Sequence, residues 1–106
     1  MDRSETINLI TEVLYQDALL VWHSRETARQ VFCSVQSVTA SEFFEAGRNG
    51  LNPEYRFTVF FGDYNGEKIV EYKGKRYGVY RTYQAKTDTL ELYVERKGGT
   101  NESDAG

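Results

Sequence analysis

The sequence has few of the residues that form cross-links, metal sites or rigid turns. Its 106 residues include one cysteine (Cys33), one histidine (His23), one proline and one methionine. A single cysteine excludes an internal disulfide and a zinc site built from several thiolates. No apolar run approaches the ~20 residues of a membrane-spanning helix, and the first residues do not resemble a signal peptide. We therefore expect a soluble protein, made and kept reduced in a cytoplasm.

Neither sign of charge dominates the chain. Thirteen Lys and Arg stand against 16 Asp and Glu, which gives a net charge of −3. This balance provides no overall attraction to nucleic acid, although a local basic patch remains open. The 40% hydrophobic and 27% charged residues are ordinary for a globular protein with a modest core. We expect one domain over residues 1–97 and a disordered C-terminal tail over 98–106, which is rich in glycine and polar residues.

Short runs of alternating apolar and polar residues fill most of the chain, and 14% of all residues are aromatic. Such runs between turn residues are typical of β-strands. Two segments fit less well: Leu19–Trp22 suits either a short strand or a flap over the barrel, and His23–Thr27 suits a polar, exposed loop. About five or six strands at this spacing predict a mainly β domain, a small antiparallel β-barrel or sandwich. The expected strands are 7–15, 29–38, 56–61, a hairpin over 68–83 closed around Gly74, and 88–95.

The alternation also predicts which side chains face the core, because successive residues of a strand point to opposite faces. Outward positions of the last strand are Glu91, Tyr93 and Glu95. Inward positions are Val31, Cys33, Val35, Phe57, Val59, Phe61, Leu90, Leu92 and Val94.

One stretch, Ser37–Tyr55, interrupts the strand pattern. Thr39 and Glu42 fit a capping box at the start of a helix, and Gly47 is suited to end that helix in a left-handed conformation. Residues 48–53 continue neither a helix nor a strand. The stretch predicts one short helix in a long inter-strand loop, and such loops usually have a function or are disordered. The apolar residues at helical spacing on one face are Ala40, Phe43 and Phe44.

Candidate catalytic and metal-binding patterns lack partners. His23 lies in the polar loop and Cys33 on an apolar strand face, which favours a surface histidine and a buried thiol over a catalytic pair. Asp63–Glu67 resembles the start of a calcium loop, but a third oxygen ligand and a later bidentate glutamate are missing, so a hairpin turn is favoured. The glycines form no phosphate loop. We expect outward charges at Glu67, Glu71, Glu91 and Glu95, and we predict no catalytic residue, no metal and no cofactor.

The hairpin over 71–83 interleaves aromatic and basic residues. On a small β-barrel such residues can bind single-stranded nucleic acid through base stacking and phosphate contacts. Cross-strand tyrosine pairs with solvated basic residues are the simpler interpretation, and the acidic net charge favours it. Single-stranded nucleic-acid binding therefore stays an alternative, with a face made of Tyr72, Arg76, Tyr77, Tyr80 and Arg81.

Four segments in succession resemble the head-closure proteins of tailed bacteriophages, also called head–tail joining or stopper proteins. They are SVTASEFFEAGRNGLNPEYRFTVF, DYNGE, YKGKRYGVYRTY and DTLELY, and the resemblance covers Thr6 to about Lys97. It implies a small β-barrel that assembles as a ring below the portal and its adaptor. There the family closes the DNA exit channel after packaging and offers a surface to which the tail docks. The implied function is structural, so no enzyme activity is expected.

The resemblance also implies the location and the partners. The protein would lie in the virion, and in the host cytoplasm during assembly. Its partners would be its own copies, the portal or adaptor ring, a tail-completion protein and, in passing, the packaged DNA, with no membrane. A tail-terminator or adaptor-type ring protein of similar fold is the first alternative.

A loop that helps to plug the channel matches Ser41–Tyr55 by position. Two glycines would let this loop rearrange, and Phe43, Phe44 and Leu51 would dock it. The residues assigned to the loop are Ser41, Phe43, Phe44, Gly47, Arg48, Asn49, Gly50, Leu51, Asn52 and Tyr55.

Overall fold

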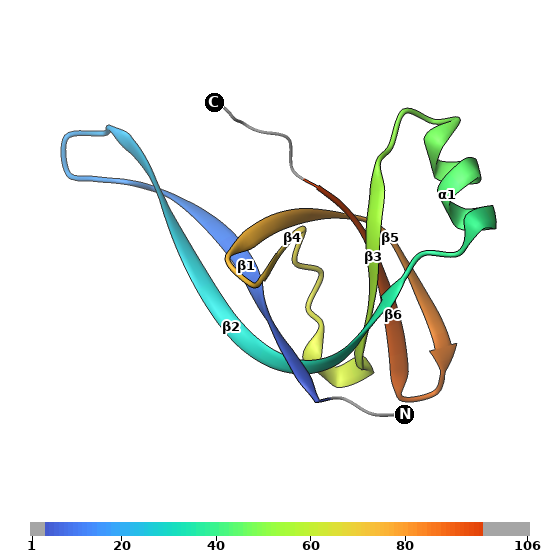
Figure 1. The fold of residues 1–106 in the computed structure, drawn as a ribbon. Helices are drawn as coiled ribbons and strands as arrows, with labels where there is room; N and C mark the ends of the chain where they lie inside the picture. The colour runs from blue at the N-terminus through green and yellow to red at the C-terminus, as the bar shows by residue number, and fades with distance from the viewer. Residues whose placement is uncertain (1–3, 97–106) are drawn as a thin grey trace.

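The computed structural model describes residues 4–96, so the expected tail over 98–106 lies outside the described residues. The mainly β prediction, with one short helix between two strands, is confirmed (Figure 1). In chain order the elements are β1 (Glu5–Gln16), β2 (Trp22–Ser37), α1 (Ala40–Gly47), β3 (Pro53–Phe60), the 3-10 helix η1 (Phe61–Asp63), β4 (Ile69–Tyr72), β5 (Lys75–Lys86) and β6 (Thr89–Arg96).

The strands close into an antiparallel barrel in the order β1-β2-β3-β6-β5-β4. A short contact closes the ring, in which Asn8–Ile10 of β1 pairs with Ile69–Glu71 of β4. Because β3 and β4 are not neighbours in this order, η1 and the coil after it carry the chain across one end of the barrel. The hairpin turn predicted over Asp63–Glu67 is therefore wrong, whereas the hairpin around Gly74 is confirmed.

Inward side chains of all six strands fill the barrel. Phe57 is fully buried and meets a cluster of tyrosine rings, with ring centroids 5.2 Å from Tyr72 and 5.6 Å from Tyr55. Such aromatic pairs contribute about 0.5–1.5 kcal/mol beyond the burial of their area. Phe61 is the one predicted inward residue that is exposed, because it begins η1 instead of continuing β3. The other predicted inward residues lie in the core or against it: Val31, Cys33, Val35, Phe57, Val59, Leu90, Leu92 and Val94.

β1 and β2 continue beyond the barrel as a two-stranded ribbon (Figure 1). β1 meets β4 only as far as Ile10, and β2 meets β3 only from Cys33 onward. Among the described residues, no third strand pairs with the outer ribbon, Thr11–Thr27, which we call the arm. The ribbon explains why the molecule measures 49 × 30 × 22 Å.

Two predictions fail in the arm. His23–Thr27 is exposed as expected, but it forms part of β2 and not a loop, because each residue pairs with one of β1. Leu19–Trp22 is neither a separate strand nor a flap over the barrel. It forms the turn at the outer end of the arm, and β2 begins at Trp22.

The helix begins where the sequence predicts it. The Thr39 hydroxyl accepts a hydrogen bond of 3.1 Å from the backbone of Glu42. Gly47 is the last residue of α1, but it does not adopt the predicted left-handed conformation. Arg48 after it is right-handed at φ −65°, and the positive φ of 79° falls at Gly50. The irregular part of the connection is therefore only residues 48–52. Within residues 4–96 no helix is long and apolar enough to cross a membrane.

Candidate functional site

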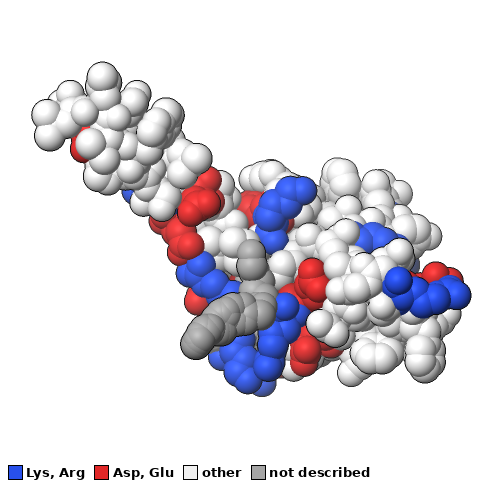
Figure 2. Space-filling view, turned by 90° about the horizontal axis from the view of Figure 1, so that it is seen from above, with Lys and Arg blue, Asp and Glu red and all other residues white. Residues whose placement is uncertain are grey.

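The outer end of the arm carries a concentration of exposed apolar side chains. Leu19 and Leu20 form its apex and are 83% and 73% exposed. Figure 2 shows that the outer arm is largely free of charged residues, while Lys, Arg, Asp and Glu gather at its base. Large exposed apolar patches mark interaction sites in soluble proteins. The patch consists of Val13, Leu14, Tyr15, Leu19, Leu20, Val21 and Trp22.

The turn at the apex is held in one conformation by Asp17. Its carboxylate accepts backbone hydrogen bonds from Leu19 at 2.8 Å and Val21 at 3.0 Å. Leu20 lies between them at φ 64°, a left-handed conformation that costs an L-residue with a side chain roughly 1–2 kcal/mol. The turn therefore presents an apolar residue where glycine or asparagine would be less strained, and such strain is typical of functional positions.

A contact between His23 and Asp17 links β2 to the turn of the arm. The Nε2 atom of His23 lies 2.7 Å from the carboxylate of Asp17, and the ring of His23 stacks on Tyr15 at 5.3 Å. The hydrogen bond with His23, together with those from the backbone, lowers the pKa of Asp17. Cys33 lies inside the barrel, and burial raises the pKa of its thiol to about 11. The contact between His23 and Asp17 thus stabilises the turn of the arm, and the thiol of Cys33 is buried away from it.

Two ion pairs fix the base of the arm. Arg76 of β5 donates two hydrogen bonds, of 2.7 and 2.8 Å, to the carboxylate of Glu26. Arg29 lies 2.8 Å from Glu67, whose carboxylate also accepts from the backbone of Asn65 at 2.8 Å. Paired guanidinium–carboxylate contacts restrict geometry more than single ones. The arm therefore has a defined direction relative to the barrel.

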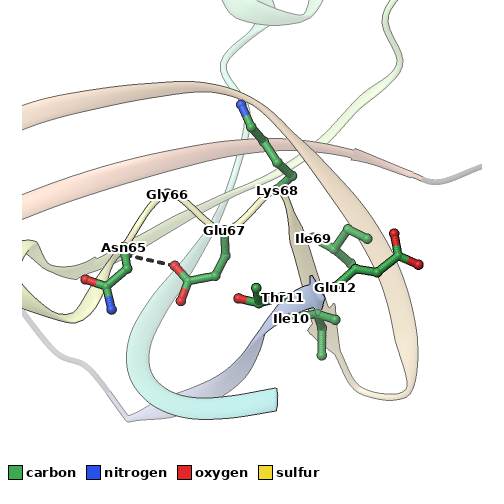
Figure 3. A pocket seen from close by; sticks show the side chains of 8 residues that line it. All are labelled: Ile10, Thr11, Glu12, Asn65, Gly66, Glu67, Lys68 and Ile69. Atoms are coloured by element: carbon green, nitrogen blue, oxygen red, sulfur yellow. Dashed lines mark hydrogen bonds between the residues drawn. The ribbon is translucent and has the colours of Figure 1, made fainter. Parts of the chain in front are cut away.

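Glu67 lies inside this contact and not on the surface. The prediction of an outward charge is wrong here, because the side chain turns into a hollow of about 290 Å³ between β1 and the coil before β4 (Figure 3). Burial raises the pKa of Glu67, but hydrogen bonds from Arg29 and Asn65 outweigh it and lower the pKa below its ordinary value. The charged carboxylate thus holds the coil before β4, which crosses this end of the barrel, against β2.

The side of the barrel opposite the arm carries α1 (Figure 1). Phe43 and Phe44, which the resemblance implied would dock the channel loop, are both exposed and pack edge to face with ring centroids 5.8 Å apart. Ala46 is the residue of α1 that is buried. Glu42 supplies the polar contact, because its carboxylate accepts from the hydroxyl of Tyr80 at 2.7 Å and from Arg81.

This contact leaves the capping box half formed. Thr39 caps the helix, but Glu42 reaches to β5 instead of back to the helix start. Burial raises the pKa of Glu42, and the hydrogen bonds from Tyr80 and Arg81 outweigh it and lower that pKa. Arg81 also lies over the ring of Tyr93 at 3.9 Å, so Tyr93 is covered although it faces outward.

The predicted channel loop does not form one surface. Asn49 and Leu51 line a hollow of about 360 Å³ between α1 and β5, and Arg48 pairs with Glu45 at 2.8 Å. Tyr55 belongs to β3 and packs against the core. Ser41, Phe43, Phe44 and Gly47 lie on α1, Gly50 lies in the turn, and Asn52 donates its backbone N–H to Glu95.

The alternative nucleic-acid face is not assembled on the surface. Tyr72 and Tyr77 are buried in the barrel and pack around Phe57, so their rings are not open to bases. Arg76 is engaged by Glu26, and Arg81 by Glu42. Stacking of bases needs exposed rings, and the barrel does not offer these two.

In the part of the chain that the structure describes, no group of three or more His, Cys, Asp or Glu could hold a metal ion. Sequence reasoning missed the apolar arm, although the run Leu19–Trp22 beside an aspartate was its signal. A comparison with protein-family models found no match for this chain, and a comparison with curated proteins found none.

Proposed function

We propose that the protein is a structural ring component of a tailed-phage connector, which closes the DNA exit channel of a filled head and receives the tail. One observation carries the proposal. A rigid barrel bears two exposed apolar elements on opposite sides, the arm and the outer side of α1. Two separated apolar surfaces suit a subunit that contacts neighbours on both sides. The four segments that resemble head-closure proteins support the same function.

The segment 39–52 is the part that we propose to enter the channel. It is attached to the barrel chiefly by the buried Ala46 and by the contact of Glu42 with Tyr80 and Arg81. A segment with few buried contacts can move while the rest of the domain stays folded. The acidic net charge of the chain suits a conduit along which DNA slides without binding.

A loop replacement in a phage that depends on this gene tests the proposal. Ser37 of β2 pairs with Tyr55 of β3, so a four-residue Asn/Gly turn in place of residues 39–52 closes the same hairpin. We expect a folded barrel by circular dichroism and filled heads that lose their DNA, whether or not tails attach. The control is Lys73→Asn in the β4–β5 turn, where Lys73 has φ 51° and asparagine fits.

Each outcome of this experiment has a distinct meaning. Normal, infectious particles from the loop replacement would remove the segment from the mechanism. Heads that retain DNA but lack tails would favour an adaptor-type or tail-terminator ring. Salt-sensitive binding of a labelled single-stranded oligonucleotide that is lost in Tyr80→Ala would favour the nucleic-acid alternative.

A further inference from the structure

We infer that the arm of one copy docks on the outer side of α1 of the next copy, so that the ring is joined by one repeated head-to-tail contact. The inference rests on the proposed function, because it specifies how the copies of that ring would meet. Its two surfaces are the apolar patch of the arm, Val13–Tyr15 with Leu19–Trp22, and the pair Phe43 and Phe44.

The aromatic residues of the two surfaces expose similar areas. With about 150–250 Å² per aromatic side chain, Tyr15 and Trp22 of the arm expose roughly 160–270 Å² and Phe43 and Phe44 of α1 roughly 180–300 Å². A standard protein interface takes about 800 Å² from each partner, so one such contact is small and is strengthened by repetition around a ring. Trp22 on this patch is 65% exposed, and tryptophan is the residue type most enriched among those that dominate binding energy.

The two surfaces cannot meet within one chain. The arm is continuous with β1 and β2 of the barrel, and the contact of Glu26 with Arg76 fixes its base. The arm and α1 leave the barrel on opposite sides (Figure 1). A contact between two different surfaces on opposite sides is heterologous, and repeated contacts of this kind form rings when the rotation closes. A second copy is therefore the occupant that carries both surfaces.

Most charges near the two surfaces are already paired. On the arm Asp17 pairs with His23, and on α1 Glu45 pairs with Arg48 and Glu42 with Arg81. Burying an unpaired charge at an interface is costly, and these pairs avoid that cost. The contact that we infer is therefore mainly apolar, and most charges beside it are paired before the copies meet.

Cysteine cross-linking in the full chain tests the contact. The native Cys33 is buried, so it does not compete with introduced thiols. Leu20→Cys and Phe44→Cys are made singly, mixed and treated with a short bismaleimide, both in solution and in assembled particles. We expect a covalent dimer with one copy of each variant. A chain that carries both substitutions should give a ladder of oligomers.

Phe32→Cys is the matched control, because Phe32 and Phe44 are similarly exposed, at 65% and 68%. Leu20→Cys should not cross-link to it. Trp22→Ser should lower the yield of the ladder about tenfold or more, as expected for a central aromatic residue. Equal cross-linking of Leu20→Cys to itself or to Phe32→Cys, or to a different protein of the particle, would overturn the inference. So would the absence of any cross-link in both settings.

The two proposals fail in different ways. Particles that need the protein to retain DNA, but whose copies do not cross-link between positions 20 and 44, would reject the head-to-tail contact alone. Copies that form the ladder, in a phage that retains DNA and accepts tails without the protein, would reject the connector function alone.

Discussion

The hydroxyl of Tyr80 donates a hydrogen bond of 2.7 Å to the carboxylate of Glu42, and this contact ties the first turn of α1 to β5. The same carboxylate accepts from Arg81, whose guanidinium covers the ring of Tyr93. Since Ala46 is the buried residue of the helix, the polar contact carries much of the attachment. The position of α1 therefore depends on a few side chains that can be changed singly.

Tyr80→Phe should loosen α1 and leave the barrel intact. The loss of one hydrogen bond to a part-buried carboxylate lowers the free energy of the local opening of α1 by about 1–2 kcal/mol. Hydrogen exchange should accelerate in residues 40–47 and stay unchanged in β3 and β6. Tyr83→Phe, at an exposed position of the same strand, is the control and should have little effect. Faster exchange throughout the barrel would contradict this role of the contact.

Glu67→Gln should remove an acid-dependent part of the stability. The pKa of Glu67 is lowered in the folded protein from an ordinary value of 4.5. A carboxylate of this kind stabilises the fold above its unfolded pKa, and the contribution is lost as the pH falls through the folded pKa. At neutral pH we expect the variant to be less stable by about 1–2 kcal/mol.

Denaturation curves at a series of pH values measure this effect. The stabilities of the native protein and of Glu67→Gln should converge as the pH falls below 4.5. Glu42 has a lowered pKa as well, but both proteins contain it, so their difference reports Glu67. The stability of Glu54→Gln, a substitution at an exposed position, should follow that of the native protein at every pH. A constant gap between native protein and Glu67→Gln at every pH would refute the prediction.

Leu20→Asn should separate the stability of the arm from its binding. Asparagine adopts the left-handed conformation more readily than leucine, so the isolated protein should be as stable as the native one or gain up to ~1 kcal/mol. Association of copies should fall, because the apex loses an exposed apolar side chain. Thermal melting and sedimentation velocity measure the two effects.

Leu19→Asn provides the comparison for this variant. Leu19 is more exposed than Leu20 but does not have a positive φ. Its substitution should weaken the contact between copies without the gain in stability. If both variants change the melting temperature alike, the strain at Leu20 is not the cause.

Cys33 should resist thiol reagents until the protein unfolds. The residue is fully buried, and burial raises the pKa of the thiol to about 11, so the reactive thiolate is rare at neutral pH. Labelling with a chromogenic disulfide should proceed at the rate of unfolding and accelerate in denaturant. Cysteine introduced at the exposed Phe32 should react at once. Rapid labelling of Cys33 in the folded protein would contradict the prediction.

The sequence predicts the barrel strands well where one face is buried. Leu90, Leu92 and Val94 are buried in the barrel and alternate with residues that face outward. This alternation of apolar and polar residues is what predicts the strand. The arm has no buried face over His23–Thr27, so its strand exists only through pairing with β1, and local patterns cannot reveal that. Long-range pairing thus explains the misread segment.

The candidate site was harder to predict for the same reason. Glu42 fits a capping box locally, but its partners Tyr80 and Arg81 lie in another strand. Register also decides which tyrosines are exposed. Tyr77 points into the barrel, and the irregularity between Val79 and Arg81 changes the alternation of β5 after it. Neither relationship has a signal in the residues nearby.

The two hydrogen bonds between Glu26 and Arg76 have a consequence for symmetry. They link the base of the arm to β5 and help to hold the angle at which the arm leaves the barrel. If each arm reaches the next copy, that angle is also the turn between successive subunits, and it determines how many subunits complete a circle. A guanidinium–carboxylate pair at the base of a ribbon would then contribute to the curvature of the assembly, and with it to the diameter of the ring.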